Sequence, residues 1–539
     1  MSKKDLYDIQ SQADLWRLAE HLRQRAGVKL DPRHTEEIFK AFRLDYGYYA
    51  HRQLWIQPKD GDICQFKFNR GQWYLYAIAE WMLHKYGKVR GIIVKGRQQG
   101  ISTWTEGRGY WKASQNTGTK VIVLAHESSA SNNIFQMFKT YHDGVHESLK
   151  PTVGKDNEKQ FEFPRLKSSV KVFSAGKKGV GRSNTCNFFH GSETAFWPHA
   201  YEHSTGIMET ISEGKGSEVY LESTAYGNVN YFASQWKCAI YPWQKEIPPN
   251  WNGYVRIFIP WFWEESYRSE VPDGFELTPD EIEYKDLHDL DNEQMQWRRL
   301  KIAKAGDDIG RFSRDYPATP EEAFNSSLDN VLIQANDVLR AKKNYKDYLH
   351  HFLSEGSTTV IGCDVAREGD DATSIVVRRG RVVLHIERHY KKKGPFVASR
   401  IIKLAQIHGV DRAFVDNTGG FGCSVLDFCE AYGYYDAVGI HFSEGAEDKD
   451  QFKNIRSEMW WKMAEWVKDG AALPDDDLLQ EDLCAPTYKH QMDKLLLESK
   501  EDMKSRGIKS PDSGDALALT FAKRVTPKSA MSYYEPEYV

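Results

Sequence analysis

Short apolar runs alternate with longer helix-like stretches through the N-terminal half of the chain. Runs rich in β-branched or aromatic residues, each ending at a polar or glycine-containing turn, occupy 91–95, 121–126, 170–175, 186–191 and 219–224. Apolar positions recur at helical spacing in residues 66–90, and residues 1–60 are polar and helix-like. Buried strands that alternate with helices are typical of a parallel α/β sheet with helices on both faces.

A second strand-rich unit is predicted towards the C-terminus. Residues 265–330 are charged and poor in strand signals. Closely spaced apolar runs after residue 357 predict consecutive strands, with a hairpin at Arg379-Gly380-Arg381. The predicted organisation is a helical region at 1–60, an α/β domain at 61–330, a linker at 331–356, a second α/β domain at 357–525 and a flexible tail at 526–539.

The turn after the first apolar run has features of a phosphate-binding loop. It reads Gly96-Arg97-Gln98-Gln99-Gly100-Ile101-Ser102-Thr103 and leads into a predicted helix. Backbone N–H groups of such a loop can surround phosphate oxygens, and Ser102 or Thr103 offers a hydroxyl to Mg²⁺. The loop departs from GxxxxGK[ST], because its first glycine comes one residue late and Ile101 replaces the lysine. A surface turn before a helix is the competing interpretation.

Two residues could supply the positive charge that this loop lacks. Arg97 lies in the turn between two glycines, where its guanidinium could form two hydrogen bonds with phosphate oxygens. Lys95 ends a buried-looking strand and could instead point along the sheet. We therefore expect Arg97 to contribute more than Lys95 to phosphate binding.

Polar residues at the ends of two later runs fit the same chemistry. Glu193 is placed to polarise an attacking water, and Ser192 stands where P-loop ATPases usually have an aspartate for Mg²⁺. The hydroxyls of Ser223 and Thr224 could sense a γ-phosphate, and the amide of Gln72 could contact adenine. Each residue alone has an ordinary alternative as a strand-end acid, a helix cap or an exposed helix residue.

Four aspartates predict a second centre. Asp364 lies within an apolar strand, where a carboxylate is costly without a metal ion or a partner. Asp416 ends another apolar run, and Asp512 and Asp515 share one face at the start of a helix. Carboxylates that converge in this way can hold two divalent ions, which clamp the attacking and leaving oxygens of a phosphodiester. A cap or turn role is the alternative for each aspartate taken singly.

Composition narrows the class of protein. The 539 residues carry 72 Lys+Arg and 76 Asp+Glu, a net charge of −4, which excludes a polyanion-coating protein but permits local basic surfaces. The seven cysteines form no CxxC pair, which is typical of reduced thiols in the cytosol. No apolar run approaches the ~20 residues of a membrane span, so no membrane contact is expected. His199 and His203, with His190 nearby, are spaced for a zinc site but lack suitably spaced acidic or Cys partners and are predicted to be structural.

Seven motifs together resemble the large terminase subunit of tailed double-stranded DNA bacteriophages or prophages. In chain order they are GRQQGIST (96–103), SETAFW (192–197), ESTAYG (222–227), DYPATPEEAF (315–324), GCDVAREGDDAT (362–373), FVDNTGGFG (414–422) and SKEDMKSRGIKSPDSGDALAL (499–519). The resemblance implies an N-terminal P-loop packaging ATPase and a C-terminal RNase H-like nuclease. It also implies ATP with Mg²⁺ or Mn²⁺ at the first site and two divalent ions at the second.

The resemblance assigns roles to individual residues. It implies that Gln72 contacts adenine, that Glu193 is the hydrolytic carboxylate and that Ser223-Thr224-Ala225 is the coupling motif. Arg182 matches an arginine that acts in trans in some members of the family. The nuclease aspartates of the family carry over to Asp364, Asp416, Asp512 and Asp515.

The implied function is ATP-driven packaging of double-stranded DNA into a procapsid, with cutting of the concatemer. The implied partners are a portal protein and a small terminase subunit, with a ring-forming homo-oligomer at the portal vertex or a monomer in the host cytoplasm. Candidate phosphate contacts are Lys391, Lys392, Lys393, Lys489, Lys494, Lys500, Lys504, Arg506 and Lys509. The alternatives are a translocase with a degenerate nuclease domain, a junction-resolvase-like nuclease and a non-enzymatic docking protein of the shell.

Overall fold

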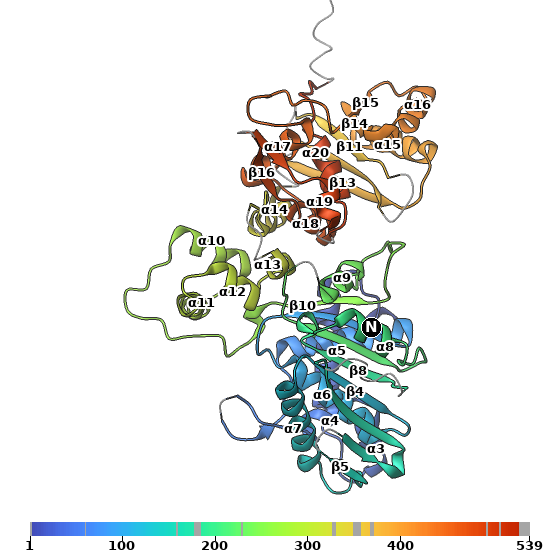
Figure 1. Cartoon of the computed structure of the whole chain (residues 1–539), viewed down its shortest axis with the longest axis vertical. Coiled ribbons are helices and arrows are strands. Elements are labelled where there is room, and N and C mark those ends of the chain that lie inside the picture. The colour runs from blue at the N-terminus through green and yellow to red at the C-terminus, as the bar shows by residue number, and fades with distance from the viewer. Residues whose placement is uncertain are drawn as a thin grey trace, which may run out of the picture. The chain divides into compact units, whose positions relative to one another are not determined.

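The computed structural model describes residues 3–59, 61–157, 160–176, 185–227, 230–325, 330–348, 357–366, 371–491, 494–505 and 508–527 (Figure 1). The chain divides into two compact units. Unit 1 comprises Met1–Ile247, Trp251–Val271 and Asn292–Ser326, and unit 2 comprises Pro248–Asn250, Pro272–Asp291 and Ser327–Val539. The predicted phosphate-binding loop belongs to unit 1 and the four predicted nuclease aspartates belong to unit 2.

An eight-stranded sheet forms the centre of unit 1, in the order β10-β3-β9-β8-β4-β7-β6-β5. Its parallel strands are β3 (Val89–Lys95), β4 (Lys120–Ala125), β7 (Ser168–Ser174), β8 (Phe188–Ser192), β9 (Glu218–Ser223) and β10 (Val255–Ile259). Antiparallel strands β5 (Lys155–Asn157) and β6 (Gln160–Phe163) extend one edge, and β1 (Trp55–Ile56) pairs separately with β2 (Cys64–Gln65). The predicted α/β sheet with parallel strands is confirmed.

Successive residues of these strands pack into opposite cores. Ile93 and Val123 belong to the core on one face of the sheet, whereas Ile92 and Leu124 belong to the core on the other. Side chains alternate between the faces of a strand, so a strand covered on both faces must be apolar throughout. This burial explains why the strands appear in the sequence as continuous apolar runs.

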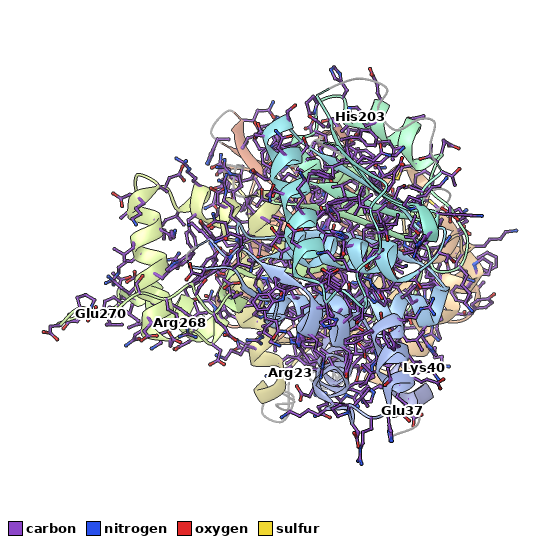
Figure 2. The ribbon with its side chains drawn as sticks, turned by 90° about the horizontal axis from the view of Figure 1, so that it is seen from below. Arg23, Glu37, Lys40, His203, Arg268 and Glu270 are labelled. Carbon is purple, nitrogen blue, oxygen red and sulfur yellow. The ribbon has the colours of Figure 1, made fainter. Side chains whose placement is uncertain are left out.

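The helices of unit 1 are α1 (Lys3–Leu6), α2 (Gln12–Gly27), α3 (Thr35–Leu44), α4 (Tyr46–Gln53), α5 (Arg70–Tyr86), α6 (Ile101–Gln115), α7 (Ser128–Gly144), α8 (Ala200–Met208), α9 (Tyr231–Cys238), α11 (Asn292–Lys304), α12 (Ile309–Asp315) and α13 (Pro320–Asn325). Residues of α2, α5, α6 and α7 share one core with the sheet, and residues of α8, α9 and α13 share the other. The predicted helical N-terminal region packs on the same core as the sheet, through residues such as Leu18 and Tyr46. Charged residues of α2 and α3 extend away from the ribbon, as Figure 2 shows for Arg23, Glu37 and Lys40.

Unit 2 contains a five-stranded sheet in the order β13-β12-β11-β14-β15. Strands β11 (Thr359–Asp364), β12 (Thr373–Arg379) and β13 (Val382–His389) are antiparallel neighbours, whereas β14 (Arg412–Asp416) and β15 (Ala437–Ile440) run parallel to β11. The predicted hairpin is present, and its Gly380 has a φ of 53°. This order and direction of strands confirm the predicted RNase H-like fold. A small hairpin, β16 (Tyr488–Gln491) and β17 (Lys494–Leu497), lies apart from the sheet.

Two groups of helices enclose this second sheet. The helices of unit 2 are α10 (Pro279–His288), α14 (Ala335–Tyr348), α15 (Gly394–His408), α16 (Cys423–Ala431), α17 (Ile455–Lys468), α18 (Asp477–Cys484), α19 (Lys500–Ser505) and α20 (Asp512–Leu519). Residues of α14, α17, α18 and α20 share one core with the sheet, and residues of α15 and α16 share the other. The stretch 331–356, predicted as a linker, thus contributes α14 to unit 2, with Val338 and Ala341 buried.

Candidate functional sites

The candidate ATP site lies at the carboxyl ends of β3, β8 and β9. Strand β3 ends at Lys95 and α6 begins at Ile101, so the intervening loop joins a strand to a helix. Gly100 has a φ of 69°, in the left-handed region that favours glycine, and a Cβ there would lie 2.7 Å from Nε2 of Gln72. No described side chain caps the N-terminus of α6, as a helix that receives phosphate with its first N–H groups requires.

Two glutamines brace this loop from inside the protein. Gln72 is 3% exposed; its Oε1 accepts a hydrogen bond from the Asn69 N–H (2.9 Å), and its Nε2 donates one to the Gly100 carbonyl (2.7 Å). Gln99 is 2% exposed and accepts a hydrogen bond from the Gly96 N–H (2.6 Å). Both side chains therefore hold the loop, and the adenine contact of Gln72 stays a prediction.

The cation that points into the site is Lys95, and this arrangement reverses our ranking of Lys95 and Arg97. Nζ of Lys95 lies 2.8 Å from Oε1 of Glu193 and 3.9 Å from Oε2 of Glu222. Burial lowers the pKa of Lys95, but these two carboxylates more than reverse that effect and raise it. The Arg97 side chain is half-exposed and pairs instead with Asp315, at 3.3 Å.

Glu193 is held by the end of the neighbouring strand β9. Its Oε2 accepts hydrogen bonds from the Ser223 hydroxyl (3.3 Å) and from the backbone N–H (3.2 Å) and hydroxyl (3.4 Å) of Thr224. Glu193 itself has φ 50° and ψ 49°, a left-handed conformation that costs a non-glycine residue roughly 1–3 kcal/mol. Strain at this acid, directly after β8, is consistent with a functional position.

The other predicted residues of the loop differ in their surroundings. Ile101 is buried in the core of unit 1, and Thr103 is half-buried in the first turn of α6. Gln98 is exposed, and its Oε1 accepts a hydrogen bond from Lys59 at 3.3 Å. Arg182 lies outside the described residues. His203, labelled in Figure 2, is buried and hydrogen-bonded to the Ala175 carbonyl at 2.7 Å, which fits a structural role.

The sequence reasoning missed Glu222, which is fully buried near the end of β9. Its Oε1 accepts hydrogen bonds from the hydroxyls of Ser102 and Ser192, the second at 3.3 Å. Nε2 of His190 lies 3.3 Å from the same oxygen. An acid directly after the apolar run Val219–Leu221, immediately before Ser223, was the signal that could have revealed it.

Buried charges compensate one another around Glu222. Burial raises the pKa of Glu222, but Lys95 and His190 outweigh it and lower that pKa to about 2. Burial lowers the pKa of His190, but Glu106, whose Oε1 lies 2.6 Å from Nδ1, and Glu222 raise it to about 9. At neutral pH the site therefore holds an ionised Glu222 between two cations.

The second candidate site gathers all four predicted aspartates in unit 2. Cys363 of β11 pairs in register with Val415 of the parallel strand β14, so Asp364 and Asp416 emerge side by side. Both aspartates are buried, and Oδ1 of Asp416 accepts hydrogen bonds from the N–H (2.8 Å) and hydroxyl (2.6 Å) of Thr418.

Helix α20 brings the other two aspartates to this edge of the sheet. The helix packs directly on β11, where a Cβ at Gly362 would lie 1.8 Å from the Ala516 carbonyl oxygen. Asp515 is fully buried, and Asp512 accepts a hydrogen bond from the Ala372 N–H at 2.7 Å. Glycine at 362 therefore permits the close contact that places the helix carboxylates near Asp364.

Lys500 lies between two of these carboxylates. Its Nζ is 3.2 Å from Oδ2 of Asp364 and 3.0 Å from Oδ2 of Asp515. Oδ1 of Asp515 accepts hydrogen bonds from Arg456 (3.0 Å) and Trp460 (2.7 Å). Among the described residues, no three Asp, Glu, His or Cys side chains form a ready-made set of metal ligands. The two-metal centre therefore stays a prediction.

The surroundings of Asp364, Asp512 and Asp515 shift the pKa values of these three carboxyl groups in different directions. Burial, together with the neighbouring aspartates, raises the pKa of Asp364 far above its ordinary value. Burial also raises the pKa of Asp512, to about 6. Burial acts in the same direction on Asp515, but Arg456 and Lys500 outweigh it and lower the pKa. The surroundings of Asp515 thus favour its charged form, whereas burial disfavours the charged forms of Asp364 and Asp512, which a bound cation would stabilise.

A cavity of about 910 Å³ opens beside this acidic cluster. Its lining includes Val365 and Ala366, which follow Asp364, and Lys391, Lys392 and Lys393, which precede α15. Among the other predicted phosphate contacts, Lys489 and Lys509 are exposed, Lys504 pairs with Asp371 at 3.2 Å, and Arg506 lies outside the described residues. The lysine run at 391–393 is therefore the basic group that lines the cavity.

Solved structures of phage proteins match the chain. The nuclease domain of the large terminase subunit gp2 of bacterial virus Sf6 is 22% identical over 35% of this chain and 98% of its own, with a TM-score of 0.32. The HK97 bacteriophage large terminase is 10% identical over 88% of this chain and 98% of its own, with a TM-score of 0.39. The large terminase nuclease of thermophilic phage G20c, 15% identical over 31% of this chain and 82% of its own, has a TM-score of 0.26.

The matching structures include nuclease domains and one complete large terminase. Structures of the Sf6 nuclease domain with manganese and of the G20c nuclease with magnesium are among the matches. No protein-family model and no curated protein matches the chain. Where the structure describes the chain, every helix is too short or too polar to cross a membrane.

Proposed function

We propose that the chain is a large terminase subunit whose unit 1 hydrolyses ATP to move double-stranded DNA and whose unit 2 cuts it. The observation that carries the proposal is the position of Glu193. Its carboxylate is held on one side by Lys95 and on the other by Ser223 and Thr224, beside a glycine-containing strand–loop–helix. A cation, an acid and a strand-end sensor at one sheet edge are the parts that ATP hydrolysis requires.

In the proposed ATPase cycle, Lys95 changes partners. The N–H groups of the loop and α6 would receive the phosphates, and Ser102 would help to hold the Mg²⁺ that neutralises their charge. Phosphate oxygens compete with Glu193 for the ammonium group of Lys95. A Glu193 released from its ion pair with Lys95 would be free to accept a proton from the attacking water. Ser223 and Thr224, which contact the same carboxylate, would transmit that change to β9.

In the proposed nuclease, the aspartates at the carboxyl ends of β11 and β14 and on α20 would hold two divalent ions, which stabilise both oxygens of the displaced phosphodiester. Asp364 is central to the cluster, because Lys500 and the other three aspartates all act on its carboxylate. Arg456 and Trp460 fix the orientation of Asp515. Lys500 compensates the negative charge of the cluster when no divalent cation is bound.

DNA contact is proposed to run mainly through phosphates. Lys391, Lys392 and Lys393 line the cavity next to the aspartates, so a duplex backbone there would meet positive charge within reach of the cutting site. Binding should weaken steeply with salt. A portal protein, a small terminase subunit and a ring of copies of this chain at the portal vertex are the proposed partners in the host cytoplasm.

Two assays on the full chain test this proposal. We expect DNA-stimulated ATP hydrolysis, together with cutting of plasmid DNA in Mg²⁺ or Mn²⁺. Glu193→Gln should reduce ATP turnover by on the order of 10²-fold or more, because the general base is lost, and should leave ATP binding intact. An absence of both activities in the wild type would reject the proposal. ATPase activity without cutting would favour a translocase with a degenerate nuclease, and strong preference for branched DNA would favour a junction resolvase.

A further inference from the structure

We infer that Glu222 supplies the metal-side carboxylate of the ATP site, in the role that an aspartate at position 192 would otherwise have. The inference rests on the proposed ATPase function and assigns a residue that the motif comparison left without a role. It explains why Ser192 can stand where P-loop ATPases usually have an aspartate, since the metal-side carboxylate would come from the adjacent strand β9.

The position of β9 makes this substitution possible. In the sheet order, β9 lies between β3, which leads into the phosphate loop, and β8, which ends at Ser192. Glu222 pairs in register with Ile93 of β3, two residues before the strand ends at Lys95. A side chain at this point is close to both neighbouring strand ends. A glutamate there can reach the place that a shorter aspartate would reach from β8.

The contacts of the Glu222 carboxylate match those of a metal-side acid. Oε1 accepts a hydrogen bond from the hydroxyl of Ser102, the loop residue that is placed to bind the nucleotide-bound cation. It also accepts one from Ser192, the residue at the vacated position. Mg²⁺ in P-loop ATPases is held between the loop hydroxyl and an acid from a neighbouring strand. Glu222 is the described acid whose carboxylate touches both residues.

The second oxygen of Glu222 accepts no hydrogen bond from the residues that the structure describes. Oε2 is completely buried, and its nearest described cation, Nζ of Lys95, is 3.9 Å away. An unsatisfied buried carboxylate oxygen costs free energy, whereas a divalent cation or its bound water would satisfy it. This oxygen lies on the side of Lys95, the residue that faces the phosphate-binding region.

Residues behind Glu222 provide the support that a metal-binding carboxylate needs. Nε2 of His190 lies 3.3 Å from Oε1, and Nδ1 of His190 lies 2.6 Å from Glu106. All three side chains are fully buried. Such outer partners orient a ligand, and their loss commonly weakens metal binding by about 10–100-fold. A purely structural ion-pair network is the competing explanation, and it predicts no effect on metal affinity in a folded variant.

The test measures metal binding without turnover. Mn²⁺ binding by the full chain is measured by electron paramagnetic resonance with and without a non-hydrolysable ATP analogue, and the nucleotide-dependent Mn²⁺ is compared, because ions held by the aspartates of unit 2 contribute to both measurements. Glu222→Gln should weaken Mn²⁺ binding by at least about tenfold. Glu193→Gln removes a charge from the same site but not the proposed ligand, so it is the matched control and should change the affinity by less than about threefold. Ser192→Asp combined with Glu222→Gln should restore most of the lost affinity.

Three outcomes decide the inference. Unchanged Mn²⁺ affinity in a folded Glu222→Gln variant would overturn it, as would an equal loss in Glu193→Gln. Melting temperatures show whether each variant folds. If Glu222→Gln does not fold, Glu222→Asp is used instead, because it retracts the charge by one methylene. Wild-type Mn²⁺ affinity in Glu222→Asp would also overturn the inference. A wild-type chain that binds no nucleotide would instead reject the proposed ATPase function itself.

Discussion

At the scale of single residues, the surroundings of Lys95 and Arg97 in the structure indicate which of them can bind phosphate better than their positions relative to the loop glycines in the sequence do. Lys95 is almost completely buried, yet its ammonium group contacts the candidate catalytic acid Glu193. Arg97 lies between the loop glycines but pairs with Asp315 at the surface. A buried cation next to an acid is poised to exchange that acid for a phosphate, whereas a half-exposed arginine in an ion pair adds little.

Lys95→Ala should therefore impair ATP hydrolysis more than Arg97→Ala. We expect a loss of turnover on the order of 10²-fold or more for Lys95→Ala, as for removal of a preorganised transition-state contact. Arg97→Ala, the matched control in the same loop, should lose less than about tenfold. Steady-state ATPase assays with melting curves for both variants provide the measurement. A greater loss in Arg97→Ala would show that the lysine pairs with Glu193 only for stability.

At the scale of elements, close backbone contacts decide which side chains can meet. Helix α20 carries Asp512 and Asp515 to the end of β11 because residue 362 has no side chain. In unit 1, helix α13 begins with a reciprocal pair of hydrogen bonds: Oε2 of Glu322 accepts from the Ala318 N–H (2.8 Å), and the Glu322 N–H donates to the Thr319 hydroxyl (3.1 Å). The contact at Gly362 and the hydrogen bonds of Glu322 each lead to a prediction about stability.

Gly362→Ala should destabilise unit 2 and slow DNA cutting. The new methyl group would overlap the Ala516 carbonyl, so α20 must shift, at a cost of about 1–3 kcal/mol for overpacking. The shift also moves Asp512 and Asp515 relative to Asp364. Differential scanning calorimetry and plasmid cutting measure the two effects. Gly445→Ala is the control, since a methyl group there meets only the end of Lys449, at 3.6 Å. Unchanged melting and cutting in Gly362→Ala would contradict the packing argument.

Glu322 should make the stability of unit 1 depend on pH. Burial raises its pKa to about 7, so between pH 4.5 and pH 7 the folded protein retains a proton that the unfolded chain releases. The protonated Glu322 therefore contributes to the free energy of unfolding; this contribution is fully present below about pH 4.5 and is lost as the pH rises through 7. Glutamine cannot ionise, so Glu322→Gln should not lose this stability as the pH rises. At pH 8 its free energy of unfolding should exceed that of the wild type by on the order of 3 kcal/mol.

Urea unfolding at several pH values between 4 and 8, followed by tryptophan fluorescence, provides this measurement. Glu265→Gln, at an exposed position in the same unit, is the control and should leave the profile of the wild type unchanged. Parallel profiles for Glu322→Gln and the wild type would show that Glu322 is not the group that titrates.

At the scale of the whole molecule, the two candidate sites belong to different compact units. Lys95, Glu193 and Glu222 lie in unit 1, whereas the aspartate cluster lies in unit 2, and each unit has its own sheet and cores. Sites without shared contacts respond independently to substitution. The ATPase and nuclease activities should therefore be separable by single changes.

Asp364→Asn should abolish plasmid cutting and leave DNA-independent ATP hydrolysis within about twofold of the wild type. The substitution keeps the size of the side chain but removes the charge at the centre of the aspartate cluster. Glu193→Gln is the reciprocal variant, which should lose ATP hydrolysis and still cut DNA. Cutting at the wild-type rate by Asp364→Asn would show that unit 2 does not use this cluster.

The sequence by itself determined the fold class of both units and most of the candidate residues. Continuous apolar runs predicted strands buried on two faces, because period-two alternation disappears when both faces are covered. Acids at the ends of such runs, among them Glu193, Asp364 and Asp416, stood out because an apolar strand does not tolerate an unpartnered carboxylate. These signals are local, so they could be recognised along the chain.

Only the tertiary structure decided which of these groups meet. The order of strands places β9 between β3 and β8, and this order brings Glu222 to Ser102 and Ser192. Likewise, Lys500 appeared to be a surface contact for DNA in the sequence, but α19 places it between Asp364 and Asp515. Strand order and helix docking are set by packing between distant segments, and the spacing of residues along the chain carries no record of it.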